Sequence, residues 1–180
     1  MTHSFTTTRG EILIREASPA DAAPWRELRL GALQDSPIAF SADYQTNLNQ
    51  PLKYWEDRLT MQADEATIFL AIREGRLIGT TGIMRDGSPK TRHGAWIWGV
   101  YVQPEWRGLH IAEDLITSCF AWARARKIVI AKLGVAAINQ PAIRCYERCG
   151  FKAYGTEPRA IFYEGKYYDE YLMYRSLDDS

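Results

Sequence analysis

The sequence predicts a single domain of mixed α/β (α+β) class, in which helices cover the faces of a central sheet. The chain has 180 residues, of which 46% are hydrophobic, and a chain of this size buries about two-thirds of the surface that its unfolded form exposes. Short β-rich runs alternate with longer segments of helical periodicity. We therefore expect one domain over residues 11–177, preceded by a flexible, polar and Thr-rich segment at residues 1–10.

Runs with the alternation or composition of strands recur along the chain. The first alternates charged and apolar residues and places Ile12 and Ile14 on one face. Two later pairs of runs are joined by short glycine-containing turns, Glu74-Gly75-Arg76 and Glu164-Gly165-Lys166, and each pair predicts a β-hairpin. The expected strands are residues 11–16, 67–72, 77–84, 95–102, 129–135, 153–162 and 167–174.

Helical segments lie between these strands. The first has Ser18 as an N-cap and Pro19 in its first turn, and it ends at Asp35-Ser36-Pro37. Residues 38–50 lack clear periodicity and are expected to form a loop. The expected helices are residues 19–35, a segment after Pro51, the amphipathic segment 113–127 and the short segment 140–149.

Charge and composition exclude several classes of partner. Lys plus Arg and Asp plus Glu each number 22, so no global field favours nucleic acid or an acidic membrane. The N-terminal residues have no apolar run of the signal-peptide kind, and charges interrupt the later apolar stretches well short of the ~18 residues of a membrane span. We expect a cytoplasmic protein whose thiols, Cys119, Cys145 and Cys149, are buried and neither form disulfides nor bind a metal.

Residues 100–113 predict an anion site, because a strand breaks at Pro104 and enters a helix through a short loop. Such a junction presents unpaired backbone N–H groups and the positive end of a helix dipole, which suit a pyrophosphate. Gly108 allows close backbone approach, and Ala112 is small in the first helical turn. Taken alone, this pattern is common in α/β domains.

This stretch resembles the signature of the GNAT acetyltransferase family, Val-x-Pro-x-x-Arg/Gln-x-x-Gly-x-Gly/Ala, at Val102, Pro104, Arg107 and Ala112. His110 stands where the signature usually has glycine, and its ring is expected at the surface or beside a phosphate, with a catalytic role as the alternative. The resemblance implies that strand backbone binds the pantetheine arm of acetyl-CoA and that loop amides bind its pyrophosphate. The implied residues are Val100, Tyr101, Val102, Arg107, Gly108, Leu109, His110, Ile111, Ala112 and Glu113.

A second segment, residues 139–151, resembles the family's Asn-x-x-Ala-x-x-x-Tyr-x-x-x-Gly-Phe pattern at every named position. Asn139 suits a helix N-cap and is also expected to reach the cofactor. Tyr146 lies two helical turns on, and the resemblance implies that its phenol is the general acid that protonates the leaving thiolate. The alternative is a buried aromatic whose hydroxyl caps a backbone group. Gly150 suits a left-handed C-cap.

The resemblance extends from Ile12 to Leu177 and implies a GNAT-like domain with a mixed sheet of about seven strands, splayed between the fourth and fifth, and about four helices. It implies direct attack of a neutral amine on the thioester, which backbone N–H of the fourth strand polarises, without a metal or a covalent intermediate. A homodimer is the frequent arrangement of the family. Acceptor recognition is expected from the loop 38–50, from Trp96 and Trp98 and from the hairpin 163–170, whose aromatic side chains and carboxylates suit a small-molecule amine. The alternative is that half of these aromatic residues belong to the core or to a dimer interface.

The general base is the weakest part of the resemblance. Many relatives carry a glutamate on the fourth or fifth strand, and the corresponding stretches here hold Trp96, Trp98 and Gly134. His93, Asp169 and Glu170 are the candidate bases, acting directly or through water, although an acceptor of low pKa needs none.

Two other functions stay open. One is a protein acetyltransferase for an N-terminal amine or lysine. The other is a non-catalytic acyl-CoA-binding sensory domain, which His110 and the missing glutamate make conceivable. The presence of both Asn139 and Tyr146 favours catalysis, because a sensor needs no acid beside the sulfur.

Overall fold

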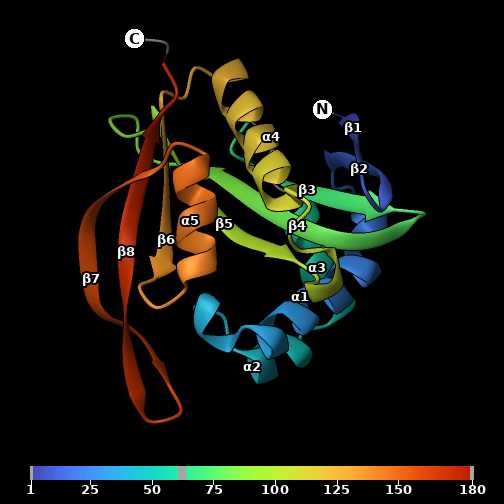
Figure 1. The fold of residues 1–180 in the computed structure, drawn as a ribbon, viewed down its shortest axis with the longest axis horizontal. Coiled ribbons are helices and arrows are strands. Elements are labelled where there is room, and N and C mark those ends of the chain that lie inside the picture. The colour runs from blue at the N-terminus through green and yellow to red at the C-terminus, as the bar shows by residue number, and fades with distance from the viewer. Residues whose placement is uncertain (1, 61–63, 179–180) are drawn as a thin grey trace.

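The protein folds around one eight-stranded sheet in the computed structural model (Figure 1), which describes residues 2–60 and 64–178. The strand order is β1-β2-β3-β4-β5-β6-β8-β7. Neighbouring strands are antiparallel except for the parallel pair of β5 and β6. The strands are β1 (Thr2–Thr7), β2 (Gly10–Glu16), β3 (Ala66–Arg73), β4 (Arg76–Arg85), β5 (Gly94–Val102), β6 (Ile130–Ala136), β7 (Lys152–Tyr163) and β8 (Lys166–Ser176).

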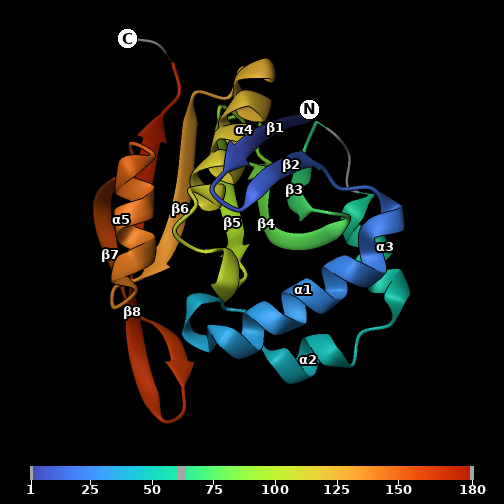
Figure 2. The same ribbon diagram turned by 45° about the vertical axis from the view of Figure 1, so that its right-hand side comes forward.

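Helices cover both faces of this sheet, as Figure 2 shows. The α-helices are α1 (Ala22–Asp35), α2 (Tyr44–Leu48), α3 (Leu52–Leu59), α4 (Ile111–Ala125) and α5 (Gln140–Arg148). Short 3-10 helices are η1 (Pro19–Asp21), η2 (Pro37–Ala39) and η3 (Pro104–Trp106). Helix α4 packs on β2 to β5 with α5 beside it, while α1 and α3 lie on the other face. No helix in the described part of the chain is long and apolar enough to cross a membrane.

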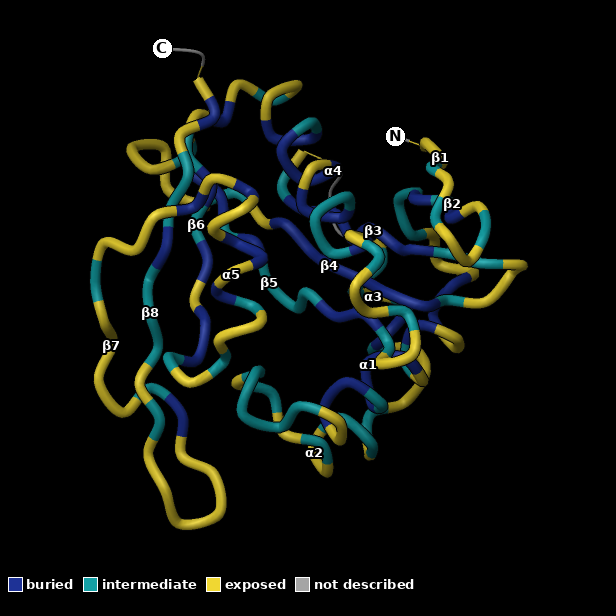
Figure 3. Tube along the Cα trace, in the orientation of Figure 1, coloured by how far each residue is buried: buried dark blue, intermediate teal, exposed yellow. Residues whose placement is uncertain are grey.

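The hydrophobic core is divided by the sheet. The larger part lies under α4 and α5 and contains Phe69, Leu115 and Phe120. On the other face, Trp25 of α1 meets Trp55 of α3 edge to face, with ring centroids 5.4 Å apart. Figure 3 shows that the central strands are buried while the tip of the β7–β8 hairpin is exposed. All three cysteines are buried and free, as predicted.

Both predicted hairpins are confirmed. Their turns place two successive residues at positive φ, Glu74 (48°) with Gly75 (78°) and Glu164 (47°) with Gly165 (76°). This is the signature of a type I′ turn, whose twist matches that of paired strands. The predicted left-handed C-cap is also confirmed, because Gly150 has φ +83° after α5.

The N-terminal segment differs from the prediction of a flexible tail. Thr2–Thr7 form strand β1, which pairs along its length with β2, and Phe5 packs partly buried against the larger core. Gly10, at φ +98°, makes the tight reversal between the two strands. An edge strand with a single apolar contact gives little periodic signal, which explains the error. Met1 lies outside the described residues.

The predicted loop at residues 38–50 is also only partly correct. It contains the end of η2 and the short helix α2. Asp43 caps α2, since its Oδ1 accepts a hydrogen bond from the backbone N of Thr46 at 2.7 Å. A helix of this length is too short to show an apolar stripe.

The predicted splay is present between β5 and β6, which correspond to the fourth and fifth strands expected from the sequence. Pairing joins Gly94–Trp96 of β5 only to Ile130–Lys132 of β6. On its other edge, β5 carries a bulge against β4, and Gly99 at the bulge has φ +65°. The second half of β5 therefore opens a gap in the sheet.

Candidate functional site

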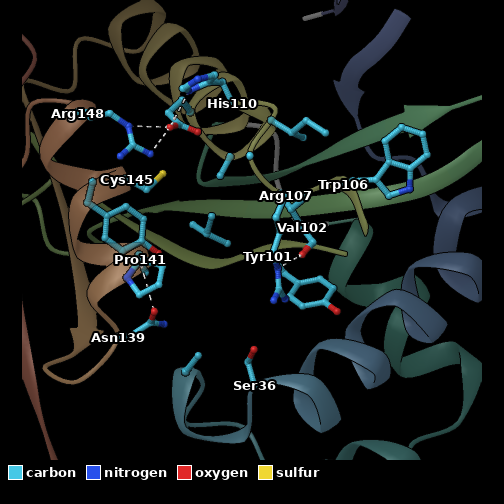
Figure 4. A pocket seen from close by; sticks show the side chains of 18 of the residues that line it. Ser36, Tyr101, Val102, Trp106, Arg107, His110, Asn139, Pro141, Cys145 and Arg148 are labelled. Carbon is cyan, nitrogen blue, oxygen red and sulfur yellow. Dashed lines mark hydrogen bonds and ion pairs between the residues drawn. The ribbon is translucent and has the colours of Figure 1, made fainter. Parts of the chain in front are cut away.

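A cavity of about 360 Å³ lies between the second half of β5, the first turn of α4, α5 and η2. Figure 4 shows Asn139, Pro141 and Cys145 on one side of it and Tyr101, Val102 and Arg107 on the other. Every predicted cofactor or catalytic residue contributes to its wall except Leu109. Those that line it are Val100, Tyr101, Val102, Arg107, Gly108, His110, Ile111, Ala112, Glu113, Asn139 and Tyr146.

The loop that enters α4 has the backbone expected of an anion site. Gly108 has φ +79°, and His110, the residue that precedes the helix, has φ 61° and ψ 17°. The position where the family signature usually has glycine is therefore left-handed, and His110 adopts that conformation in spite of its Cβ. The N-cap residue His110 makes no side-chain cap hydrogen bond to the first turn of α4, whereas the carboxylate of Glu113 accepts from its own backbone N–H. The N–H groups at the start of α4 that precede Glu113 are thus available to an anion at the positive end of the helix dipole.

A charged cluster borders this first turn. Arg148 of α5 donates to Oε1 of Glu113 from Nη2 (2.6 Å) and Nε (3.1 Å), and Nδ1 of His110 lies 3.1 Å from the same oxygen. Burial opposes the charge of Glu113, but hydrogen bonds from Arg148 and His110 prevail and lower its pKa. The carboxylate is therefore ionised, and the positive charge of Arg148 offsets the repulsion that it would exert on a nearby anion.

The two remaining loop residues, Arg107 and Leu109, differ in their position relative to the cavity. Arg107 lines the cavity, but its Nε donates to the carbonyl of Val102 (3.0 Å) and its Nη2 pairs with Asp35 at the end of α1. These contacts hold the loop against β5. Leu109 lies outside the cavity wall and packs against the larger core.

Helix α5 positions the predicted catalytic pair. Asn139 is its N-cap, as predicted, and its Oδ1 accepts from the backbone N of Ala142 at 3.3 Å. Tyr146 lies two turns further on, 8% exposed. Burial raises the pKa of its phenol, so the group stays protonated at neutral pH. No hydrogen bond ties this hydroxyl to any other group in the ranges 2–60 and 64–178, so the alternative of a backbone cap finds no partner there.

The backbone of β5 completes the wall opposite Tyr146. Beyond Trp96 no pairing with β6 is present in the described residues, so the β6-facing amides and carbonyls up to Val102 border the gap. In an extended strand, the N–H and C=O groups that point to one edge belong to every second residue. This edge offers N–H donors to a carbonyl oxygen and hydrogen-bond partners to an amide-containing arm.

The three candidate bases are separated by the structure. His93 precedes the first residue of β5, at the opposite end of that strand from Val100. Asp169 accepts a hydrogen bond from the backbone N of Arg159 at 2.8 Å in the hairpin. Glu170 of β8 reaches across to β6, and its Oε2 is 3.1 Å from where a Cβ on Gly134 would stand. Of the three, Glu170 is the residue whose carboxylate is directed at β6, and it pairs with Ala136 of that strand beside the splay.

The environment of Glu170 suits proton transfer. Gly134 belongs to the β6 face that is turned away from α4 and α5, since its neighbours Leu133 and Val135 belong to the larger core. Burial raises the pKa of Glu170, and the cross-strand neighbour Glu157 raises it further. A carboxyl group with an elevated pKa is a better base near neutral pH than an ordinary one.

Sequence reasoning missed part of the cavity wall. Ala39 and Phe40 belong to segment 38–50, which the sequence assigns to the acceptor side, and the remaining additional lining residues are Ser36, Trp106, Pro141, Ala142, Cys145 and Arg148. Pro141, Ala142 and Cys145 share helix α5 with Tyr146, and helical spacing offers a signal for them. Arg148 shows no such signal, because its pairing with Glu113 depends on how α5 packs beside α4.

Comparison with protein families finds a match to the family described as "Acetyltransferase (GNAT) family", over residues 31–151. An L-amino acid N-acetyltransferase of Escherichia coli is 31% identical over 127 residues, which cover 67% of this chain and 74% of that protein. An aminoglycoside N(6')-acetyltransferase type 1 of Stenotrophomonas maltophilia is 34% identical over 116 residues, which cover 62% of this chain and 67% of that protein.

Solved structures agree with this match. An acetyltransferase of the GNAT family from Streptococcus pneumoniae superposes with a TM-score of 0.82 at 28% identity, covering 92% of this chain and 99% of that one. A phosphinothricin acetyltransferase from Sinorhizobium meliloti, solved in complex with acetyl-CoA, has a TM-score of 0.80 at 19% identity, with 96% and 89% covered.

Proposed function

Because the chain belongs to the GNAT acetyltransferase family and is an acetyl-CoA-dependent N-acetyltransferase, we propose that it acetylates the primary amine of a small molecule. Transfer is by direct attack within a ternary complex of donor and acceptor. The observation that carries the proposal is the single cavity wall that joins the uncapped first turn of α4 to Asn139 and Tyr146 beside the splayed β5.

The donor half of this wall fits acetyl-CoA. Two left-handed residues, Gly108 and His110, turn the loop so that the first-turn amides of α4 face an anion, and we assign the pyrophosphate to these amides from Gly108 to Glu113. The edge of β5 from Val100 to Val102 and the side chain of Asn139 are assigned to the pantetheine arm. Acetyl-CoA supplies, when bound, an acetyl thioester whose sulfur departs as a thiol.

Protons are handled by two side chains in this proposal. The buried phenol of Tyr146 holds a proton at Oη and donates it to the departing sulfur. The carboxylate of Glu170 accepts, directly or through water, the proton that the amine loses as its nitrogen bonds to the acetyl carbon. Backbone N–H on the free edge of β5 stabilises the negative charge on the carbonyl oxygen.

The choice of a small acceptor is supported by the relatives. The E. coli relative is an L-amino acid N-acetyltransferase and the S. maltophilia relative acts on aminoglycosides. In this chain Phe40 reaches the cavity from the segment after η2, and Tyr101 and Trp106 also line it. Aromatic walls of this kind suit a compact organic amine.

The proposal is tested by measuring thiol release from acetyl-CoA against amino acids, aminoglycosides, polyamines and peptides, with acetyl-CoA binding followed by calorimetry. We expect release with one class of small amine and intersecting initial-velocity lines, which indicate a ternary complex. Parallel lines would indicate a covalent intermediate and contradict direct attack. Release with peptides alone would replace the small acceptor by a protein, and tight binding without any release would favour the sensory alternative.

A further inference from the structure

Arg29 of α1 is a buried cation whose Nη1 has no hydrogen-bond partner among the described residues. Its residue is 8% exposed, and its Nη1 is fully enclosed with no hydrogen bond to the described residues. No carboxylate within the described ranges forms an ion pair with it. An unpaired buried guanidinium costs several kcal/mol by general estimates, so a partner absent from the free protein is a natural explanation.

The groups around Arg29 are aromatic or cationic. Its Cζ lies 4.8 Å from the ring centroid of Phe40. The pKa of Arg29 is lowered to about 10, mainly because its guanidinium is buried. The nearby positive charge of Arg58 on α3 adds to this shift, and Tyr54 opposes it. Arg29 therefore still carries its charge at neutral pH. Arg58 donates to the hydroxyl of Tyr54 (3.0 Å) and stacks over Trp98.

The position of Arg29 relates it to the acetyl-transfer site. Nη1 lies 3.2 Å from where a Cβ on Gly99 would stand, at the bulge of β5. The next residue, Val100, lines the donor cavity. Phe40 also lines that cavity while its ring covers the guanidinium. One aromatic side chain thus separates the donor cavity from an unpaired cation on the opposite face of β5.

We propose that Arg29, in the positive field of Arg58, binds the carboxylate of the acceptor, and that the acceptors are amino acids or similar small amino carboxylates. The inference rests on the proposed function and deepens it by naming the substrate class. Displacement of Phe40 from the guanidinium opens the path between the two sites. A planar guanidinium binds a carboxylate through two parallel hydrogen bonds, and this fixes the orientation of the attached amine.

The test compares each of a panel of L-amino acids with its own C-terminal amide, in wild type, Arg29→Gln and Arg29→Lys. We expect wild type to have the higher kcat/KM for the acid in at least one pair, and Arg29→Gln to lower that acid-to-amide ratio by roughly 30- to 1000-fold. Lysine keeps the positive charge but lacks the two parallel N–H donors of the guanidinium. Arg29→Lys should therefore have an acid-to-amide ratio between those of wild type and Arg29→Gln. An amino acid and its amide differ in the pKa of the amine. This difference cancels when the acid-to-amide ratio of kcat/KM in a variant is divided by the same ratio in wild type.

Arg26→Gln is the matched control, because Arg26 lies one turn earlier on α1 and donates instead to the backbone carbonyl of Leu48 at 2.9 Å. It should leave the acid-to-amide ratio unchanged. If Arg29→Gln slows acid and amide equally, or if wild type favours the amide in every pair, Arg29 is a structural residue and the proposal is overturned. Where Arg29→Gln does not fold, the Arg29→Lys ratio decides.

A second measurement is independent of turnover. Saturation-transfer NMR on the protein with CoA, using a mixture of the common L-amino acids and then a mixture of their amides, should detect binding of acids that Arg29→Gln abolishes. Acid binding without acetylation of any amine would sink the proposed function but support the anion site. Acetylation of amines without any dependence on a carboxylate would support the proposed function and overturn the carboxylate site at Arg29.

Discussion

The carboxylate of Glu170 occupies the space above Gly134, with Oε2 3.1 Å from the position that a Cβ would take. Strand β6 has no side chain at Gly134, and its antiparallel neighbour β8 supplies the carboxylate that lies there. A carboxylate from a residue far along the sequence thus lies beside Gly134 of β6. This relationship makes Glu170 the base to test first.

Replacing Glu170 with glutamine should lower kcat by about 10²-fold or more for an acceptor that arrives protonated, because the amide cannot accept the proton. In wild type, the rate should rise with pH through the raised pKa of Glu170, and this limb should be absent from the variant. The measurement is the pH profile of kcat with a saturating amine. An unchanged profile in Glu170→Gln would remove this carboxylate from the mechanism.

Glu157→Gln is the matched control, since Glu157 faces Glu170 across the β7–β8 pair and is exposed. It removes a like charge that raises the pKa of Glu170, so the acid limb should move to lower pH while kcat is retained. The raised pKa of Glu170 also affects the stability of the fold. Burial favours protonated Glu170 in the folded state, so this advantage is present at low pH and lost as pH rises through the raised pKa. Glu170→Gln should therefore unfold at higher urea than wild type at pH 8.

Sequence reasoning located the features that depend on local order. The Pro104 strand break, the Asn139 cap and Gly150 after α5 are each recognisable from neighbouring residues, and the structure places them as expected. The two hairpins are predictable for the same reason. Their two-residue turns need positive φ at both positions, and a glycine at the second position is visible in the sequence.

Features that depend on the packing of distant segments were not predictable. The approach of Glu170 to Gly134 is set by the register of β8 on β6. The enclosure of Arg29 requires α1, α3 and the β5 bulge together, and its position in an amphipathic helix resembles that of any surface arginine. Strand β1 was missed because pairing to β2, rather than periodicity, makes it a strand.

Tyr146→Phe should lower kcat by about 10²–10⁴-fold and leave the Kd of acetyl-CoA almost unchanged, because it removes only the proton donor. The ring keeps its edge contact with Phe151, whose centroid is 6.2 Å away, so the fold should be retained. Stopped-flow thiol release and calorimetry measure the two quantities. Unchanged release would show that another group protonates the sulfur, and a large loss of affinity would assign Tyr146 to binding instead.

Asp21→Asn should destabilise the fold by about 2 kcal/mol at neutral pH. Hydrogen bonds from Arg15 (2.7 and 2.8 Å) lower the pKa of Asp21 to about 2, burial opposes this, and bonds from Ser18 add to it. A lowered carboxyl pKa stabilises the fold above the ordinary value of 3.8, and this stabilisation is lost as pH falls through about 2. Urea unfolding of both proteins should therefore differ at pH 7 and converge near pH 2. Asp57→Asn, which disrupts only the exposed pair with Lys53, should change nothing measurable.

His110→Gly should stabilise the protein by roughly 0.5–1 kcal/mol, because a left-handed residue with a Cβ is strained and glycine is not. The gain is smaller than the strain, since glycine loses more backbone entropy on folding and the contact of His110 with Glu113 is lost. His110→Ala is the control: it removes the same ring but keeps the Cβ, so it should give no such gain. Thermal unfolding measures the difference.

The same two variants separate the roles of backbone and ring at the pyrophosphate loop. If backbone amides of the first turn of α4 hold the anion, as the uncapped helix indicates, both variants should bind acetyl-CoA within about threefold of wild type. A loss of about tenfold or more in both variants would show that the imidazole contacts a phosphate. A loss in His110→Gly alone would show instead that the Cβ of His110, by restricting the loop, holds the amides in their binding geometry, and calorimetry at fixed ionic strength distinguishes these outcomes.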